Sequence, residues 1–107
     1  MSSKLEFVEY VCEQMADAGV IEYKRMFGEY GVYCDKKYIG LICDDQLFLK
    51  KTKKAEALLD EVIEEIPYQG AKPHFLIENI ENHQKLSEIV MATYKELPEP
   101  KPKRKKS

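Results

Sequence analysis

The hydrophobic pattern changes its period along the chain, and this change constrains the fold more than any other feature of the sequence. Residues 20–51 are crowded with aromatic and β-branched residues, which favour strands. Asp35-Lys36-Lys37 and Asp44-Asp45 separate the apolar runs and are typical of hairpin turns. The stretch therefore predicts four consecutive antiparallel strands, near residues 21–27, 29–34, 38–43 and 46–50.

Before these strands, apolar residues recur at the three- and four-residue spacing of an amphipathic helix. This spacing predicts a helix from Lys4 to Ala18, capped by Ser2 or Ser3 and ended by Gly19. Because the pattern begins directly after the first few residues, we expect no signal peptide and a cytoplasmic protein. No apolar run reaches the roughly 20 residues that a membrane span needs, so we expect no membrane contact.

After the strands the helical spacing returns. Thr52 is a good N-cap for a helix that Pro67 ends. The apolar stripe of this helix is Ala55, Leu58, Leu59, Val62, Ile63 and Ile66. A loop over residues 68–73, a short strand over 74–78 and a last helix over 82–96 follow. This order predicts an α+β domain, α-β(4)-α-β-α, with an antiparallel sheet flanked by helices.

The length of 107 residues allows one small domain. Residues 99–107 hold five basic residues and one acid, whereas residues 1–98 hold 12 basic and 18 acidic ones. Prolines at positions 98, 100 and 102 prevent a helix at this boundary. We therefore expect a domain over residues 1–98 and a disordered basic tail over residues 99–107. The net charge of −2 excludes a generally basic protein that coats nucleic acid.

The turn between the second and third strands decides which side chains share a face of the sheet. With Lys36-Lys37 as the two-residue turn, Cys34 faces Ile39 and Tyr30 faces Cys43. One face then holds Tyr30, Val32, Cys34, Ile39, Leu41, Cys43 and Phe48, and the other holds Tyr33, Tyr38, Ile42, Leu47 and Leu49. Since neither face is polar, either helices cover both faces or part of one face is a contact surface. We favour the contact surface and expect a homodimer through the sheet or its edge.

The residue types that usually carry catalysis or metal binding are scattered along the chain. Cys12, Cys34 and Cys43 form no Cys-x-x-Cys pair, and the two histidines, His74 and His83, are separate from them and from each other. No serine lies in the context of a nucleophile elbow. We therefore expect free thiols in a reducing cytoplasm, with no catalytic residue, no metal and no cofactor.

Lys24-Arg25 precede a strand sequence that glycines interrupt. Glycine in a strand often marks a bulge or the close approach of another backbone. A guanidinium beside such a strand can bind a partner's carboxylate through two hydrogen bonds. The candidate partner-contact residues are Arg25, Phe27, Gly28, Tyr30 and Gly31. The alternatives are a twisted hairpin with a surface arginine and an internal ion pair that fixes the hairpin.

A second candidate surface is basic. Four lysines cluster where a strand meets the start of a helix, where cations are disfavoured and an anionic partner would relieve the repulsion. Together with the tail, the candidate anion-binding residues are Lys50, Lys51, Lys53, Lys54, Lys103, Arg104, Lys105 and Lys106. The alternative is a set of solvated lysines whose stems splay apart. Because the body is acidic, we expect nucleic-acid binding to be weak, nonspecific and dependent on the tail.

The segment Arg25-Met26-Phe27-Gly28-Glu29-Tyr30-Gly31-Val32-Tyr33 resembles the arginine-methionine-phenylalanine-glycine segment of TfoX N-terminal domains. These domains occur in the TfoX/Sxy regulators of bacterial DNA-uptake competence. Further similarities, over about residues 4–98 in all, are Gly40–Cys43, Asp45–Lys50, the Gly70–Pro73 loop and the late helix ending at Leu97-Pro98. The resemblance implies an α+β fold similar to that of type III secretion chaperones, and it implies no catalytic residues.

The resemblance also implies a function. Longer members of the family carry a second, helical domain and act as positive regulators of competence genes with a transcriptional coactivator. We expect a stand-alone N-terminal domain here. Our leading interpretation is a non-enzymatic bacterial protein-interaction module that regulates transcription through protein partners. The alternative is a nucleic-acid accessory protein that uses the Lys-rich tail, and a small enzyme is the third interpretation.

Overall fold

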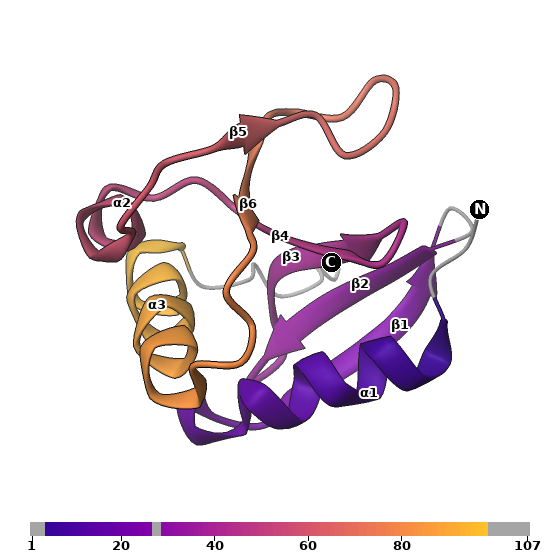
Figure 1. The fold of residues 1–107 in the computed structure, drawn as a ribbon, viewed down its shortest axis with the longest axis horizontal. Coiled ribbons are helices and arrows are strands. Elements are labelled where there is room, and N and C mark those ends of the chain that lie inside the picture. Colours follow the sequence, from indigo (N-terminus) through magenta and orange to yellow (C-terminus); the bar gives the residue numbers. More distant parts are fainter. Residues whose placement is uncertain (1–3, 27–28, 99–107) are drawn as a thin grey trace, which may run out of the picture.

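The computed structural model describes residues 4–26 and 29–98. In chain order its elements are α1 (Leu5–Gln14), a 3-10 turn (Ala16–Ala18), β1 (Ile21–Met26), β2 (Glu29–Cys34), β3 (Lys37–Cys43), β4 (Gln46–Leu49), α2 (Lys53–Leu58), β5 (Glu64–Glu65), β6 (His74–Ile77) and α3 (His83–Glu96). The strands form one antiparallel sheet in the order β1-β2-β3-β4-β6-β5, with the helices packed outside it (Figure 1). The predicted α+β fold with an antiparallel sheet is confirmed.

The four strands that the sequence predicts over residues 21–50 are present, each within one residue of its expected bounds. One tight turn joins β2 to β3 and another joins β3 to β4, and both central residues of each turn have positive φ. The angles are 49° at Asp35, 72° at Lys36, 55° at Asp44 and 57° at Asp45. This geometry matches the twist of a two-residue hairpin, and aspartate tolerates it better than most residues do.

The first of these turns corrects the predicted register. It is Asp35-Lys36 rather than Lys36-Lys37, and the Asp35 carboxylate accepts a hydrogen bond from Val20 N (2.9 Å) that ties it to the start of β1. Lys37 therefore begins β3 and pairs with Cys34, whereas the predicted register pairs Cys34 with Ile39. A lysine expected in a solvated turn is instead buried, with 5% of its surface exposed.

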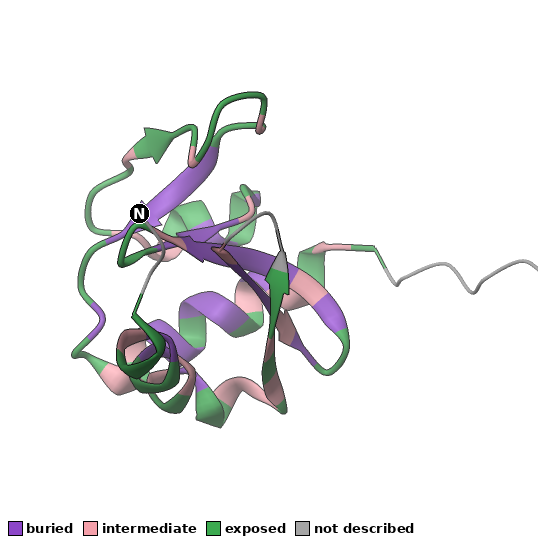
Figure 2. Cartoon of the chain, turned by 90° about the vertical axis from the view of Figure 1, so that its right-hand side faces the viewer, coloured by how far each residue is buried: buried purple, intermediate pink, exposed green. Residues whose placement is uncertain are grey.

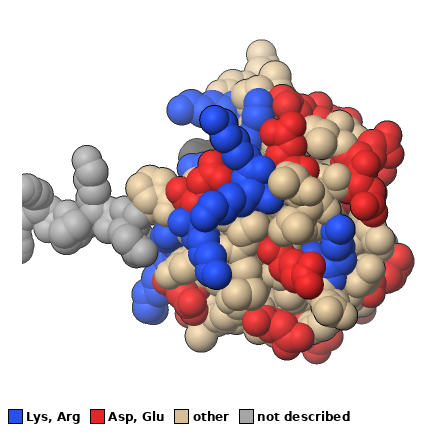
Figure 3. Space-filling model, turned by 90° about the vertical axis from the view of Figure 1, so that its left-hand side faces the viewer, with Lys and Arg blue, Asp and Glu red and all other residues tan. Residues whose placement is uncertain are grey.

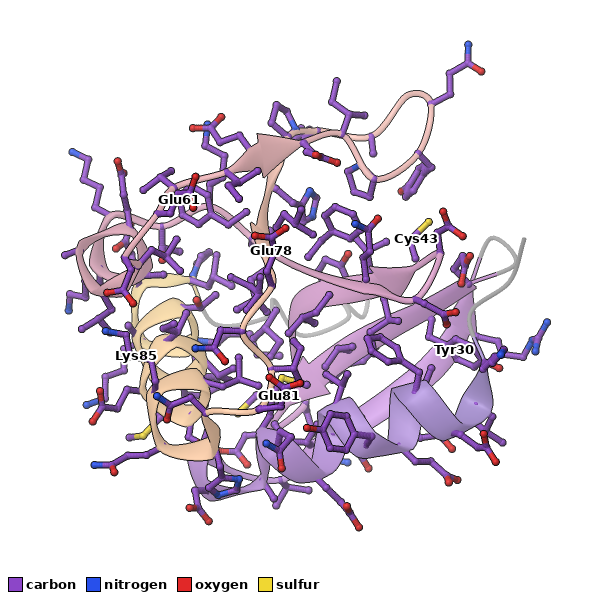
Figure 4. All side chains as sticks on the ribbon, viewed as in Figure 1. Tyr30, Cys43, Glu61, Glu78, Glu81 and Lys85 are labelled. Carbon is purple, nitrogen blue, oxygen red and sulfur yellow. The ribbon has the colours of Figure 1, made fainter. Side chains whose placement is uncertain are left out.

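A bulge in β3 changes the faces of the sheet as well. Ile39 has no opposite residue of its own in β2, and beyond it Tyr30 pairs with Ile42 rather than with Cys43. The predicted faces are therefore wrong after the bulge, since Tyr30 shares a face with Ile42, Leu47 and Leu49, and the other face carries Leu41, Cys43 and Phe48. Figure 4 shows Tyr30 and Cys43 on opposite sides of the sheet.

The residue after the bulge has to be glycine. A Cβ atom on Gly40 would overlap the carbonyl oxygen of Phe48 and lie 2.9 Å from Leu49 Cα. Both are backbone atoms of the paired strand β4, so neither can move aside without breaking the pairing. The glycine that interrupts this strand is thus explained by the close approach of a neighbouring backbone.

α1 and α3 cover the face of the sheet that carries Tyr30 (Figure 1). The buried residues that they add to the core on this face are Val8, Val11, Leu86, Ile89 and Val90, and Met15 directly after α1 is buried with them. The α-helix ends at Gln14, short of the predicted Ala18, and a 3-10 turn over Ala16–Ala18 continues to Gly19, whose φ is 152°. The expected caps Ser2 and Ser3 lie outside the described residues.

α3 follows its prediction closely. Asn82 caps it, its side-chain oxygen accepting a hydrogen bond from Lys85 N (3.1 Å). At the other end, the ammonium of Lys37 donates to the carbonyl oxygens of Tyr94 (2.9 Å) and Leu97 (2.8 Å). A buried cation thus satisfies carbonyls that the end of a helix leaves without partners. Among the described helices, none has both the length and the apolar character that crossing a bilayer requires.

The second predicted helix is only partly correct. Thr52 caps α2 as expected, its Oγ1 accepting a hydrogen bond from Ala55 N (3.1 Å), but α2 ends at Leu58. The chain then runs extended into β5, which pairs with β6, and Pro67 follows this strand instead of ending a helix. The apolar residues of this stretch suit a helix or an extended chain. The extended form allows Ile63 to pack on the face of the sheet opposite α1 and α3.

Among the described residues, none from a helix belongs to the buried cluster on the second face, which carries Cys43. Leu41, Phe48 and Leu76 are buried there, and Tyr38, Cys43 and Ile63 pack partly buried beside them. The chain between α2 and β6 supplies cover, because Ile63 O accepts a hydrogen bond from Leu76 N (2.8 Å) and Pro67 O accepts one from Cys43 Sγ (3.3 Å). The buried residues accordingly include much of the central strands (Figure 2). An extended segment thus covers part of this face. The sequence predicts only cover by helices or an uncovered contact surface.

Candidate interaction surface

β1 lies at one edge of the sheet and pairs with β2 alone within the described ranges. Glu22, Lys24 and Arg25 are exposed on it. An edge strand presents backbone N–H and C=O groups to which another chain can bind. The strand at the opposite edge, β5, has only two residues. β1 is therefore the edge best suited to a partner.

The structure holds Arg25 against a buried tyrosine. Arg25 Nη1 donates a hydrogen bond to the Tyr30 hydroxyl (3.2 Å), and its guanidinium carbon lies 5.4 Å from the centre of that ring. Tyr30 is 6% exposed, and Tyr23 packs edge-on against it with ring centres 5.7 Å apart. The exposed guanidinium is thus presented from a well-packed support, which reduces the entropy lost when a carboxylate binds.

The other predicted contact residues are placed differently. Tyr30 and Gly31 are both buried in β2. Phe27 and Gly28 lie outside the described residues. Of the predicted set, Arg25 is the described residue that reaches the surface, and Tyr30 positions it from below.

A groove of about 650 Å³ runs between β1 and α1. Its lining combines apolar side chains with three acids: Cys12, Ala16, Ile21, Tyr23, Glu9, Glu13 and Glu22. Sequence reasoning missed this groove because the acids of α1 have the spacing of an ordinary solvated helix face. An acidic groove beside an edge strand favours a partner strand that carries basic side chains.

The lysine cluster at the start of α2 already has an anion from within the chain. The carboxylate of Glu96, at the end of α3, accepts hydrogen bonds from Lys53 N (3.1 Å) and Lys54 N (2.9 Å). These backbone hydrogen bonds lower the pKa of Glu96. Lys51 is also engaged, in an ion pair of 2.9 Å with Glu64. The carboxylate of Glu96 therefore occupies the N-terminus of α2, where the sequence predicts an anion from a partner.

On the side of the molecule that carries α2 and α3, Lys and Arg side chains gather in one area with Asp and Glu around it (Figure 3). Lys50 is in a different environment from its three neighbours, since its Nζ lies 5.5 Å from the centre of the Tyr38 ring on the second face. The predicted tail residues Lys103, Arg104, Lys105 and Lys106 lie outside the described residues.

All three cysteines are free thiols. Burial raises the pKa of Cys12 and of Cys34 to about 11 in each case. Burial, with a smaller contribution from the carboxylate of Glu29, also raises the pKa of Cys43. Because the thiolate is the nucleophile and the metal ligand, these environments disfavour both kinds of chemistry at neutral pH.

The two histidines lie in different environments. His83 Nε2 is 2.6 Å from a carboxylate oxygen of Asp17 at the surface. His74 is buried, and its Nδ1 donates a hydrogen bond to the carbonyl oxygen of Lys72 (2.7 Å). Burial lowers the pKa of His74, and its buried Nε2 has no hydrogen-bond partner among the described atoms. Across the described residues, no three His, Cys, Asp or Glu side chains come together as ligands for a metal ion.

A smaller cavity of about 170 Å³ lies between α3, β6 and the extended segment after α2. Its lining residues include Glu61 of the extended segment, Glu78 directly after β6 and Lys85 of α3 (Figure 4). Most of its other lining is apolar, including Leu59, Ile63, Leu76, Ile77 and Ile89. Small-molecule sites usually have volumes of about 300–1,000 Å³, so we assign no ligand to this cavity.

Comparison with known proteins gives two similarities. The family model of the TfoX N-terminal domain matches residues 13–98, which span the whole sheet and α3. The chain is also similar to a protein of Spirochaeta aurantia described as an uncharacterized 12.7 kDa protein in the 5′ region of trpE. The two are 29% identical over 108 residues, which cover 100% of this chain and 94% of the relative.

Proposed function

The chain belongs to the TfoX N-terminal domain family, and on this premise we propose that it is a non-enzymatic protein-interaction module of the bacterial cytoplasm. Because the family is associated with competence regulation, the module regulates the transcription of such genes through protein partners. The alternative, a nucleic-acid accessory protein that acts through its basic tail and lysine cluster, has less support, since Glu96 and Glu64 occupy part of that cluster.

The observation that carries this proposal is the edge strand β1 with its supported arginine. The strand offers a backbone for pairing, Arg25 is a fixed cation on one side of it, and the acidic groove lies on the same side. These features suit a strand from another protein that brings a carboxylate to Arg25 and basic side chains to the groove.

A second copy of the chain has the complementary charges. If two β1 strands pair antiparallel about Tyr23, Glu22 of each copy lies opposite Lys24 of the other. Opposite charges directly across a strand pair stabilise the pairing. The contact is self-complementary, as a two-fold symmetric dimer requires.

The same pairing gives Arg25 a partner. Arg25 of one copy falls opposite Ile21 of the other, on the face where Glu9 and Glu13 of α1 line the groove. The guanidinium then meets carboxylates across the interface. This supports a homodimer in which β1 continues the sheet from one copy into the next.

Charge reversal tests the dimer. We expect the full chain to sediment as a dimer at micromolar concentration, and Lys24→Glu to weaken the dimer about tenfold or more, because it places like charges opposite each other twice. The double variant Glu22→Lys/Lys24→Glu restores opposite charges and should recover the parent's dissociation constant.

Circular dichroism provides the control, since all three chains should show the same folded spectrum. A parent chain that stays monomeric at every concentration would contradict the dimer. So would a charge reversal that changes nothing. Failure of the double variant to recover the affinity would place the interface elsewhere.

A further inference from the structure

A hollow of about 600 Å³ lies on the second face of the sheet, where β3 and β6 begin and β4 ends. Its side-chain lining includes Tyr38, Lys50, Lys51, Tyr68, Lys72 and His74. The Gly70–Pro73 loop forms another part of the wall. The volume is that of an ordinary small-molecule site.

The lining combines flat rings with positive charge. Tyr68 is 41% exposed, and burial raises the pKa of Tyr38 to about 12, so the Tyr38 ring is neutral at physiological pH. Lysines come from the two residues after β4 and from the loop, and no lining residue is acidic. Glu64 borders the hollow through its ion pair with Lys51. A ligand that carries both a planar ring and a negative charge fits this chemistry.

His74 adds a polar atom that no described residue satisfies with a hydrogen bond. Its Nδ1 donates to the carbonyl oxygen of Lys72, so Nε2 of the neutral ring is an acceptor. This Nε2 is buried and has no donor within the described ranges. Because His74 is only 8% exposed, bulk water does not supply the donor either. Leaving a buried acceptor without a partner is unfavourable, and such a group at the wall of a hollow indicates a missing donor.

The rings and cations continue from the hollow across the sheet. Tyr38 packs edge-on against Tyr33, with ring centres 5.6 Å apart, and Lys24 Nζ lies 5.2 Å from the centre of the Tyr33 ring. Glu22, which pairs with Tyr33, adds one acidic side chain beside these rings and cations. The surface is therefore locally basic and aromatic although the body of the protein is acidic.

We propose that this hollow binds a nucleobase joined to a phosphate, either as a free nucleotide or as one unit of a single-stranded nucleic acid. The base stacks on the tyrosines, and the phosphate lies at Lys50 and Lys72. Stacking on tyrosine accepts any base, so binding is not selective for sequence. This site lies in the folded body and includes Lys50 and Lys51 of the predicted lysine cluster, whereas the sequence predicts nucleic-acid binding that depends on the tail.

The test titrates the full chain with adenosine monophosphate, with a ten-nucleotide oligoadenylate RNA and with inorganic phosphate, followed by two-dimensional NMR and calorimetry. The two nucleotide probes should shift the resonances of Tyr38, Tyr68, Lys72 and His74, and inorganic phosphate should bind much more weakly. Tyr68→Ala should weaken nucleotide binding about tenfold through lost stacking. Lys72→Gln should weaken it and reduce its salt dependence.

Matched controls separate this site from the rest of the surface. Tyr10 is 40% exposed on α1, almost the same as Tyr68, and Lys95 is exposed at the end of α3. Tyr10→Ala and Lys95→Gln should leave the affinity unchanged. A decanucleotide that binds more than about tenfold tighter than the mononucleotide identifies a single strand as the ligand, and equal or weaker binding identifies a free nucleotide.

Three results would overturn the proposal. One is the absence of binding by either nucleotide. Another is binding that neither Tyr68→Ala nor Lys72→Gln weakens, which would place the binding outside this hollow. The third is inorganic phosphate binding as tightly as the mononucleotide, which would leave the rings without a role.

Discussion

Arg25 is the residue for which the sequence leaves two roles open, a contact with a partner and an internal ion pair. In the structure it donates a hydrogen bond to the hydroxyl of Tyr30, a neutral group. Arg25→Ala should therefore change the free energy of unfolding by no more than about 0.5 kcal/mol, as ordinary surface substitutions do. It should weaken self-association, because the guanidinium is lost from the β1 edge. Thermal unfolding and sedimentation measure the two effects separately.

Arg25→Lys is the matched variant, since it keeps the charge and loses the planar fork of donors. It should unfold like the parent and retain part of the association. If Arg25→Ala instead melts well below the parent and still associates, Arg25 holds the fold and the contact assignment is wrong.

Lys37 is a residue whose role depends on burial. The residue is 5% exposed, and its ammonium donates to two carbonyl oxygens at the end of α3. Lys37→Met keeps most of the apolar stem and removes both hydrogen bonds. We expect the free energy of unfolding to fall by about 2 kcal/mol, the usual size for hydrogen bonds to a charged group, as measured by urea denaturation.

Lys95 offers the comparison for this prediction, because it is exposed in the last turn of the same helix. Lys95→Met should change the free energy of unfolding by less than about 0.5 kcal/mol. Equal stability of Lys37→Met and the parent would show that the cap at the end of α3 adds nothing.

At the scale of the element, α2 is too short to be stable alone. It has six residues, so it depends on its cap and on the carboxylate of Glu96 at its N-terminus. Since the folded chain lowers the pKa of Glu96, the ionised carboxylate stabilises the fold above the ordinary value of 4.5. That contribution is lost as the pH falls through the lowered pKa.

Glu96→Gln should therefore be less stable than the parent at pH 7, and the difference should shrink as the pH falls well below 4.5. Urea unfolding of both chains at neutral and acid pH measures this. Glu88→Gln, exposed earlier on α3, should follow the parent at both pH values. A difference between Glu96→Gln and the parent that stays constant with pH would exclude the charge as the cause.

At the scale of the whole molecule, the sheet is buried from both sides by different kinds of structure. α1 and α3 cover one face, and Ile63 of the extended segment packs on the other. Ile63→Ser should uncover Leu41, Phe48 and Leu76, and should raise the binding of an apolar dye and the tendency to aggregate. The near-ultraviolet signal of the main core should persist.

Ile66 lies on the same segment and is 58% exposed, so Ile66→Ser is the control for this prediction. It should leave dye binding unchanged. Equal dye binding by the Ile63→Ser and Ile66→Ser chains would show that Ile63 does not cover the second face.

Features with a local signal were predictable from the sequence. The two-aspartate turn, Thr52 and Asn82 each act on backbone groups within about three residues, so their neighbours in the chain are sufficient to define them. The strands of residues 21–50 and the last helix follow from such signals together with the hydrophobic period. Arg25 could be singled out as a candidate, but its support by Tyr30 depends on the pairing of two strands.

By itself, therefore, the sequence determined which segments form helices and strands wherever a cap, a turn or a regular period marks them. Tertiary structure alone decided the bulge at Ile39, the extended form of residues 59–65 and the anion at the start of α2. Each of these depends on atoms distant in the chain. The carboxylate of Glu96, for example, accepts a hydrogen bond from the backbone N–H of Lys54, which lies 42 residues earlier. An apolar stripe such as that of residues 55–66 fits a helix and a strand alike, and the choice between them rests on which uncovered surface the folded sheet presents.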